Sequence, residues 1–197
     1  AREAGVLEPY LVGVQGAAAD AGIRDRMSER FLDKLPPLLP DGAILTAGNT
    51  CLMHDGAAFL MVASGQYVKE HNLTPLVEII DSVTVGGNPD KSPETAILAI
   101  QKLLAKTGHT AEDIAVFECN EAFAVIDELF ARAYPEAIDR YNRYGGALAY
   151  GHPYGASGGI ITIHACRALQ ETPGYAVCSI AAAGGIGHAL LLRSGGM

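Results

Sequence analysis

Segments typical of strands and segments typical of helices alternate along most of this chain. Apolar runs, several of them rich in β-branched residues that suit a pleated sheet, predict strands at 76–85, 114–118, 147–149, 175–180 and 188–192. Between them, apolar stripes with helical spacing predict helices at 93–107, 122–133 and 157–169. Such alternation is typical of an α/β layered fold, and here it predicts a mixed or mostly parallel sheet.

Two helices carry clear local signals. Ser92 can cap a helix whose first residue is Pro93, and Gly108 can end it. Upstream, residues 55–71 are rich in alanine and larger apolar side chains with little polar relief. That composition predicts a helix buried on most sides, with Asn72 as a left-handed cap.

Residues 1–41 differ from the rest of the chain. The stretch 24–35 is dense in charge, and Pro36 and Pro37 follow it, so a short helix that ends before the prolines is expected among surface connections. The regular pattern begins at Gly42. We therefore expect a connecting segment at 1–41 and the folded domain at 42–197.

Composition excludes several classes of protein. The chain has 197 residues, of which 49% are hydrophobic, which suffices for a sizeable core. A formal net charge of −8 disfavours nucleic acid or an anionic membrane surface as the main partner. No apolar run reaches the ~18 to 20 residues of a membrane-spanning helix, and no apolar secretory segment opens the chain. The four cysteines show no metal-ligand spacing, so no metal site is expected, and a cytoplasmic protein with reduced thiols is predicted.

Three polar or glycine-rich segments interrupt the apolar pattern, and each lies at the end of a predicted strand. They are 119–124, 145–159 and 181–189. Open α/β sheets bind their ligands at such strand ends. None of the segments has the glycine and lysine spacing of a nucleotide-phosphate loop. A ligand site other than a phosphate cradle is therefore expected.

His152 is the residue of these segments that most invites a chemical role. A single histidine between a glycine and a proline is more often a structural turn residue than a catalytic one. The glycines around His152 favour the functional interpretation, because they let a substrate approach the imidazole at little steric cost.

Together these segments resemble the C-terminal half of thiolases in order and spacing. The matching stretches are Asn-Glu-Ala-Phe-Ala at 120–124, Gly-Gly-Ala-Leu-Ala-Tyr-Gly-His-Pro-Tyr-Gly-Ala-Ser-Gly at 145–158 and Ala-Gly-Gly-Ile-Gly-His-Ala at 183–189. Thr-Ala-Gly-Asn at 46–49, followed by Asp-Gly-Ala-Ala at 55–58, resembles the segment that opens that half. The resemblance implies a thiolase-like layered fold with helices on both faces of a mixed, mostly parallel sheet. It also implies that residues 1–41 are the end of the family's loop domain.

The resemblance implies an acyltransferase of lipid metabolism that cleaves 3-ketoacyl-CoA with a thiol or runs the reverse Claisen condensation. Coenzyme A and acyl-CoA would be substrates, and no covalently bound cofactor is implied. In the family's pattern His152 is the catalytic histidine, and Asn120 holds a water beside it in the oxyanion site. Phe123 would line the acyl or pantetheine tunnel, and the main-chain N–H of Ala183 would lie in a second oxyanion hole.

Two departures from the family's pattern concern its catalytic thiols. The acyl-accepting cysteine belongs to the N-terminal half, which has no counterpart in this sequence. The second, proton-shuttling cysteine aligns with Ala181, whose methyl group cannot exchange a proton. Cys178 lies three residues upstream, and an odd offset in a strand points to the opposite face, so we expect a buried structural residue. Cys51 replaces a usual serine that contacts pantetheine, where a thiol is a weaker hydrogen-bond partner.

We therefore expect one subunit of a split thiolase, with the nucleophilic cysteine on a separate N-terminal chain and a hetero-oligomer or a dimer of dimers as the assembly. Two alternatives stay open. One is a non-catalytic thiolase-like subunit that stabilises an active partner. The other is half of a condensing enzyme that uses Cys, His and Asn and needs no second cysteine. Intact Asn120 and His152 favour a retained site.

Overall fold

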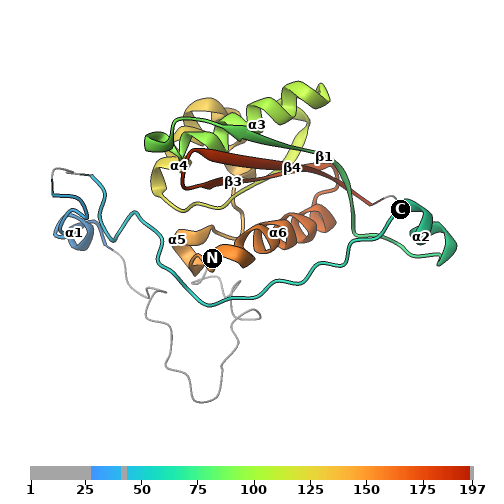
Figure 1. Ribbon diagram of the computed structural model, residues 1–197, viewed down its shortest axis with the longest axis horizontal. Helices are drawn as coiled ribbons and strands as arrows, with labels where there is room; N and C mark the ends of the chain where they lie inside the picture. Colours follow the sequence, from blue (N-terminus) through green and yellow to red (C-terminus); the bar gives the residue numbers. More distant parts are fainter. Residues whose placement is uncertain (1–27, 41–43, 196–197) are drawn as a thin grey trace, which may run out of the picture.

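The computed structural model describes residues 28–40 and 44–195, and its centre is a four-stranded sheet (Figure 1). The strands are β1 (Val77–Gly86), β2 (Ile114–Cys119), β3 (Tyr175–Ala182) and β4 (Ile186–Ser194), in the order β1-β4-β3-β2. β2 and β3 are parallel, whereas β4 runs antiparallel to both of its neighbours. The mixed sheet is confirmed. The expectation of mostly parallel pairing is corrected, because a turn with Gly184 and Gly185 at φ 90° and 77° returns the chain as an antiparallel hairpin.

Helices cover both faces of the sheet (Figure 1). α3 (Glu94–Thr107) and α4 (Ala124–Ala133) lie on one face, and α6 (Ser157–Glu171) lies on the other. Each face of the sheet carries its own hydrophobic core. Adjacent side chains of β2 point to opposite faces, so Phe117 packs in the core beside α3 and Val116 in the core beside α6. The shorter helices are α1 (Glu29–Leu32), α2 (Gly65–Glu70) and α5 (Ala147–Tyr150), with 3-10 turns η2 (Pro89–Lys91), η3 (Ala111–Asp113), η4 (Pro135–Arg140) and η5 (Tyr154–Ala156).

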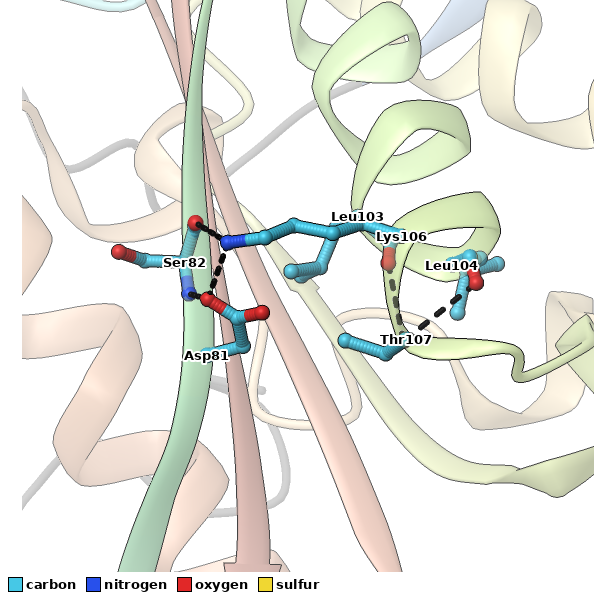
Figure 2. A network of polar contacts seen from close by, with 6 residues as sticks. All are labelled: Asp81, Ser82, Leu103, Leu104, Lys106 and Thr107. Atoms are coloured by element: carbon cyan, nitrogen blue, oxygen red, sulfur yellow. Dashed lines mark hydrogen bonds and ion pairs between the residues drawn. The ribbon is translucent and has the colours of Figure 1, made fainter.

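The boundaries of α3 agree with the prediction to within a residue. The helix begins at Glu94, one residue later than expected, and Gly108 ends it in a left-handed conformation with φ 72°. Figure 2 shows how its last turn meets the sheet: Lys106 Nζ donates to Asp81 Oδ1 over 2.6 Å and to Ser82 O over 3.3 Å. This ion pair is exposed, so the buried apolar face of α3 contributes far more to holding the helix in place.

The prediction of a buried helix over 55–71 is wrong. Only Gly65–Glu70 is helical, and residues 55–64 form an extended segment that runs past α5 and α6 towards α2 (Figure 1). Phe59 and Met61 in this segment are 91% and 93% exposed. An apolar composition produces a buried helix only where another surface covers it, and most of this segment is exposed in the described part of the chain. Asn72 does adopt the left-handed conformation, with φ 49°.

Residues 147–149 form a turn of helix, α5, and not the predicted strand. Ala147 is 1% exposed, and its N–H donates to Asn120 O over 3.2 Å, which ties α5 to the end of β2. Three apolar residues are too few to distinguish the helical period from the strand period. His152 therefore lies in a loop that follows a helical turn, and not a strand.

The expected short helix before the prolines is α1, capped by Ser28, whose Oγ accepts from the Phe31 N–H. The part of the 1–41 prediction that precedes residue 28 lies outside the described residues, as does the proposed boundary itself at 41–43. The division into two segments stays a prediction. No helix of the described residues has the length and apolar character needed to cross a membrane.

Candidate active site

The parallel strands β2 and β3 end at the edge of the sheet where the candidate site lies. Asn120 directly follows β2, and its N–H donates to Ser179 O of β3 over 3.0 Å. β3 continues from there to Ala182. Asn120, Ala181 and Ala183 therefore share the carboxyl edge of two parallel strands, which is where α/β sheets place their ligand-binding groups.

His152 reaches this edge from the loop that follows α5. The loop turns at Gly151, which has φ 99°, and a Cβ there would lie 2.2 Å from the ring of His54, so only glycine fits. The N–H of His152 donates to Leu52 O over 3.0 Å. This hydrogen bond fixes the stretch around Cys51 and Leu52 beside the loop that carries His152.

Both ring nitrogens of His152 have protein partners. Nδ1 lies 2.6 Å from Ser157 Oγ at the start of α6, and Nε2 lies 3.3 Å from Asn120 Nδ2. Because an amide nitrogen only donates, this arrangement makes Nε2 the acceptor and leaves the ring proton on Nδ1, which donates to Ser157. The residue is 9% exposed, and burial lowers the pKa of its imidazole. The site holds a neutral imidazole whose basic nitrogen faces Asn120.

Two further side chains support this pair, although sequence reasoning gave neither a role. Ser157, which holds Nδ1, follows His152 by five residues inside the motif at 145–158, and that spacing was the available signal. Glu121 Oε2 accepts from the Leu148 N–H of α5 over 3.3 Å. Burial and the neighbouring Asp127 raise the pKa of Glu121 to about 8, so this pair of carboxyl groups retains a proton at neutral pH.

None of the chain's four thiols is activated as a nucleophile. Cys119 and Cys178 are 1% and 4% exposed, and burial raises the pKa of both thiols. Burial also raises the pKa of Cys51 and of Cys166. A thiol with a raised pKa stays protonated near neutral pH, and the thiolate is the reactive form. Across residues 28–40 and 44–195, no three His, Cys, Asp or Glu side chains gather where they could hold a metal ion.

Cys51 and Phe123 belong to two segments that meet beside Asn120. The N–H of Cys51 donates to Ala122 O over 3.0 Å, and Thr50 forms an antiparallel bridge with Phe123. Both side chains are partly exposed. They are therefore close to the edge that carries the site, as a role in binding a substrate requires.

Ala181 and Ala183 lie at the hairpin that joins β3 to β4. Ala181 pairs with Gly187, and Ala183 is exposed in the turn. Within the described residues, no hydrogen bond joins either of them to His152. Their assignment to the site therefore still rests on the resemblance.

The comparisons with known proteins agree with one another. The model of the thiolase C-terminal domain matches residues 73–194. The chain is 42% identical over 181 residues to an acetyl-CoA acetyltransferase of Synechocystis, an alignment that covers 90% of this chain and 46% of that protein. It is 37% identical over 183 residues to the human mitochondrial 3-ketoacyl-CoA thiolase, covering 92% and 46%.

Solved structures show the same likeness. The acetyl-CoA acetyltransferase of Bacillus anthracis superposes with a TM-score of 0.86 at 27% identity, covering 98% of this chain and 51% of that one. The human mitochondrial 3-ketoacyl-CoA thiolase in complex with CoA gives a TM-score of 0.82 at 32% identity, covering 98% and 50%. The chain spans about half the length of the relatives it matches.

Proposed function

Because the chain belongs to the thiolase family, we propose that it supplies the histidine and the asparagine of an active site that acts on acyl-CoA. The observation that carries the proposal is the approach of His152 Nε2 to Asn120 Nδ2 at 3.3 Å, with the other ring nitrogen held by Ser157. Relatives named 3-ketoacyl-CoA thiolase and acetyl-CoA acetyltransferase support thiolytic cleavage of 3-ketoacyl-CoA, or the reverse condensation, as the reaction.

In this reaction His152 acts as the general base. In the acyl-transfer half of the reaction, Nε2 takes the proton of the coenzyme A thiol, the thiolate attacks the thioester carbonyl carbon of the acyl-enzyme, and the carbonyl oxygen takes up the negative charge. The protonated imidazole and the amide of Asn120, directly or through a water, then donate to that oxyanion. The C–S bond to the acyl-accepting cysteine then breaks, and the proton moves from Nε2 to the sulfur of that cysteine. Ser157 keeps the second ring proton on Nδ1 throughout.

The acyl-accepting thiolate comes, in this proposal, from a complementary N-terminal half on a separate polypeptide. The raised pKa of every thiol in this chain supports an outside nucleophile. The extended segment at 55–64 supports an outside partner, because Phe59 and Met61 expose large apolar side chains that a second half would bury. The assembly would be a hetero-oligomer or a dimer of dimers in the cytoplasm.

Three further residues have proposed roles around the pair. Phe123 and Cys51, which meet beside Asn120, would contact the acyl chain and the pantetheine arm of coenzyme A. The main-chain N–H of Ala183 would donate to a second oxyanion. The superposition with the human enzyme in complex with CoA supports coenzyme A as the group that is bound.

Ala181 favours a second candidate function. Its methyl group cannot supply the proton exchange that deprotonates acetyl-CoA, so acyl transfer between thiols would be retained. Condensation and the reverse cleavage, which share this proton transfer, would be slowed by about 10²- to 10⁴-fold. A condensing enzyme that uses Cys, His and Asn would lose nothing by this alanine. A third candidate, a non-catalytic partner subunit, predicts that no change at His152 affects turnover.

The test is thiolysis of a 3-ketoacyl-CoA by the chain combined with its complementary half. We expect His152→Ala to abolish turnover, because the base is lost. His71→Ala is the matched control, since His71 is exposed at the end of α2, far from α5 (Figure 1). Unchanged thiolysis in His152→Ala would refute the role of this histidine and support the non-catalytic alternative.

A further inference from the structure

A second group of polar side chains lies next to the catalytic pair and has no part in the proposed reaction. It consists of Glu118 on β2, Tyr150 at the end of α5 and His164 on α6, and we name it the buried triad. Glu118 is 0% exposed and His164 is 7% exposed. His164 Nδ1 lies 3.6 Å from Glu118 Oε2, and the rings of His164 and Tyr150 meet edge to face at 5.3 Å.

The polar atoms of the buried triad complement one another chemically. Both carboxyl oxygens of Glu118, the hydroxyl of Tyr150 and Nδ1 of His164 are buried without a hydrogen bond to any other described residue. A buried carboxylate without donors is strongly unfavourable. Tyr150 and His164 offer two donors to the two oxygens of Glu118, either directly or through one bridging water.

The electrostatics of Glu118 agree with this pairing. Burial raises the pKa of its carboxyl group, and His164 and Arg143 act in the opposite direction. Burial raises the pKa of the Tyr150 phenol, and the negative charge of Glu118 raises it further. The three side chains thus interact as one group.

Each member of the buried triad shares an element or a loop with a member of the active site. The pairs are Glu118 with Asn120, Tyr150 with His152, and His164 with Ser157. The first two pairs are two residues apart, and the third is seven residues apart on α6, which is two turns along the same face. Any shift of β2, α5 or α6 would therefore disturb both groups together.

We infer that the buried triad positions the active site: hydrogen bonds from Tyr150 and His164 to Glu118, direct or through a water, link β2, α5 and α6 so that His152 Nε2 stays within reach of Asn120. Glu118, Tyr150 and His164 are positioning residues, because none of them touches the reacting atoms. The catalytic consequence of this inference rests on the proposed function. The coupling of the triad to the ring of His152 can be measured without it.

Tyr150→Phe tests the inference with the smallest change. It removes one oxygen atom and keeps the ring against His164. Tyr144→Phe is the matched control, because the ring of Tyr144 also meets His164 edge to face, at 5.6 Å, but its hydroxyl donates to Glu171 over 2.9 Å. Glu118→Gln is the second variant, which keeps the volume and changes the acceptor.

The first measurement is the ¹⁵N spectrum of the imidazoles in the whole chain at one pH, with His152 and His164 assigned by substitution. We expect Tyr150→Phe and Glu118→Gln to shift the signals of both histidines and Tyr144→Phe to leave those of His152 in place. Unmoved His152 signals in Tyr150→Phe, or equal shifts in the Tyr144→Phe control, would overturn the inference.

The second measurement is thiolysis by the complete enzyme. Tyr150→Phe should lower kcat about 10-fold with KM unchanged, because the ring of His152 is displaced and the binding surface is not. A kcat equal to that of the wild type would overturn the positioning role. If the wild-type enzyme itself has no thiolase activity, the proposed function fails, and the imidazole spectra alone decide whether the triad positions His152.

Discussion

Removal of the Ser157 hydroxyl is the most direct test of the proposed His152 geometry, since it changes neither His152 nor Asn120. Ser157 is 2% exposed, and its Oγ lies 2.6 Å from His152 Nδ1. In Ser157→Ala the Nδ1 proton loses its partner in a site closed to water, which costs about 1 to 3 kcal/mol. The neutral ring then favours the other tautomer, with the Asn120 amide turned so that its oxygen accepts from Nε2–H, and the base is lost.

That free energy corresponds to a loss of about 10- to 100-fold in kcat, since each 1.36 kcal/mol is about tenfold in rate. The assay is steady-state thiolysis by the complete enzyme, and KM should stay within about twofold because no binding surface changes. Ser179→Ala is the control, as Ser179 is also buried but donates to Ala96 O of α3 on the other side of the sheet. Equal losses of kcat in the two variants, or none in Ser157→Ala, would refute the assigned tautomer.

Three other substitutions test separate parts of the account. Glu121→Gln should flatten the pH dependence of thermal unfolding. Glu121 keeps its proton to about pH 8 when the chain is folded but ionises near its ordinary value of 4.5 when it is unfolded, so wild-type stability should fall as pH rises between these values. Identical profiles of Tm against pH in the two proteins would contradict this. Ala181→Cys should raise condensation and the reverse cleavage by about 10²-fold or more, with acyl exchange between thiols less affected. No gain would favour the enzyme that uses Cys, His and Asn. Gly151→Ala should lower the free energy of unfolding by about 1 to 3 kcal/mol or more, because the backbone has φ 99° there and the added Cβ would clash with the ring of His54. A denaturation curve equal to that of the wild type would show that the loop adapts.

The sequence alone predicted the elements that carry their own signals. Helix α3 ends at a left-handed glycine where local rules place one, whereas Pro93 takes the N-cap position, one residue before the predicted place, and Ser92 forms no side-chain cap. β2 and β3 are short apolar runs that a buried parallel pair requires. These elements are specified within a few residues, so no knowledge of distant contacts was needed.

The failures share one physical cause, which is dependence on a surface elsewhere in the fold. Residues 55–64 have the composition of a buried helix but lie extended, because composition does not say what packs against it. α5 forms where Ala147 meets the carbonyl of Asn120, a contact between distant parts of the chain. The antiparallel place of β4 depends on the left-handed conformations of Gly184 and Gly185, which turn the chain back along β3.

The candidate site was likewise predicted only in part from the sequence. The resemblance placed His152 and Asn120 in one site, and the structure brings their side chains to 3.3 Å. Ser157 was missed because a serine at a helix start is ordinarily a cap, and only the three-dimensional turn at Gly151 directs the imidazole onto it. Glu118 was missed because a single carboxylate in an apolar strand gives no sign of its partners.

The central claim is that this chain supplies the base of the reaction and another half supplies the nucleophile. It is tested by incubating the combined halves with acyl-CoA, trapping the acyl-enzyme and mapping the modified peptide by mass spectrometry. The account predicts acylation of a cysteine in the complementary half and an unmodified Cys51, Cys119, Cys166 and Cys178. An acyl group on any of these four cysteines, formed at the rate of turnover, would contradict it.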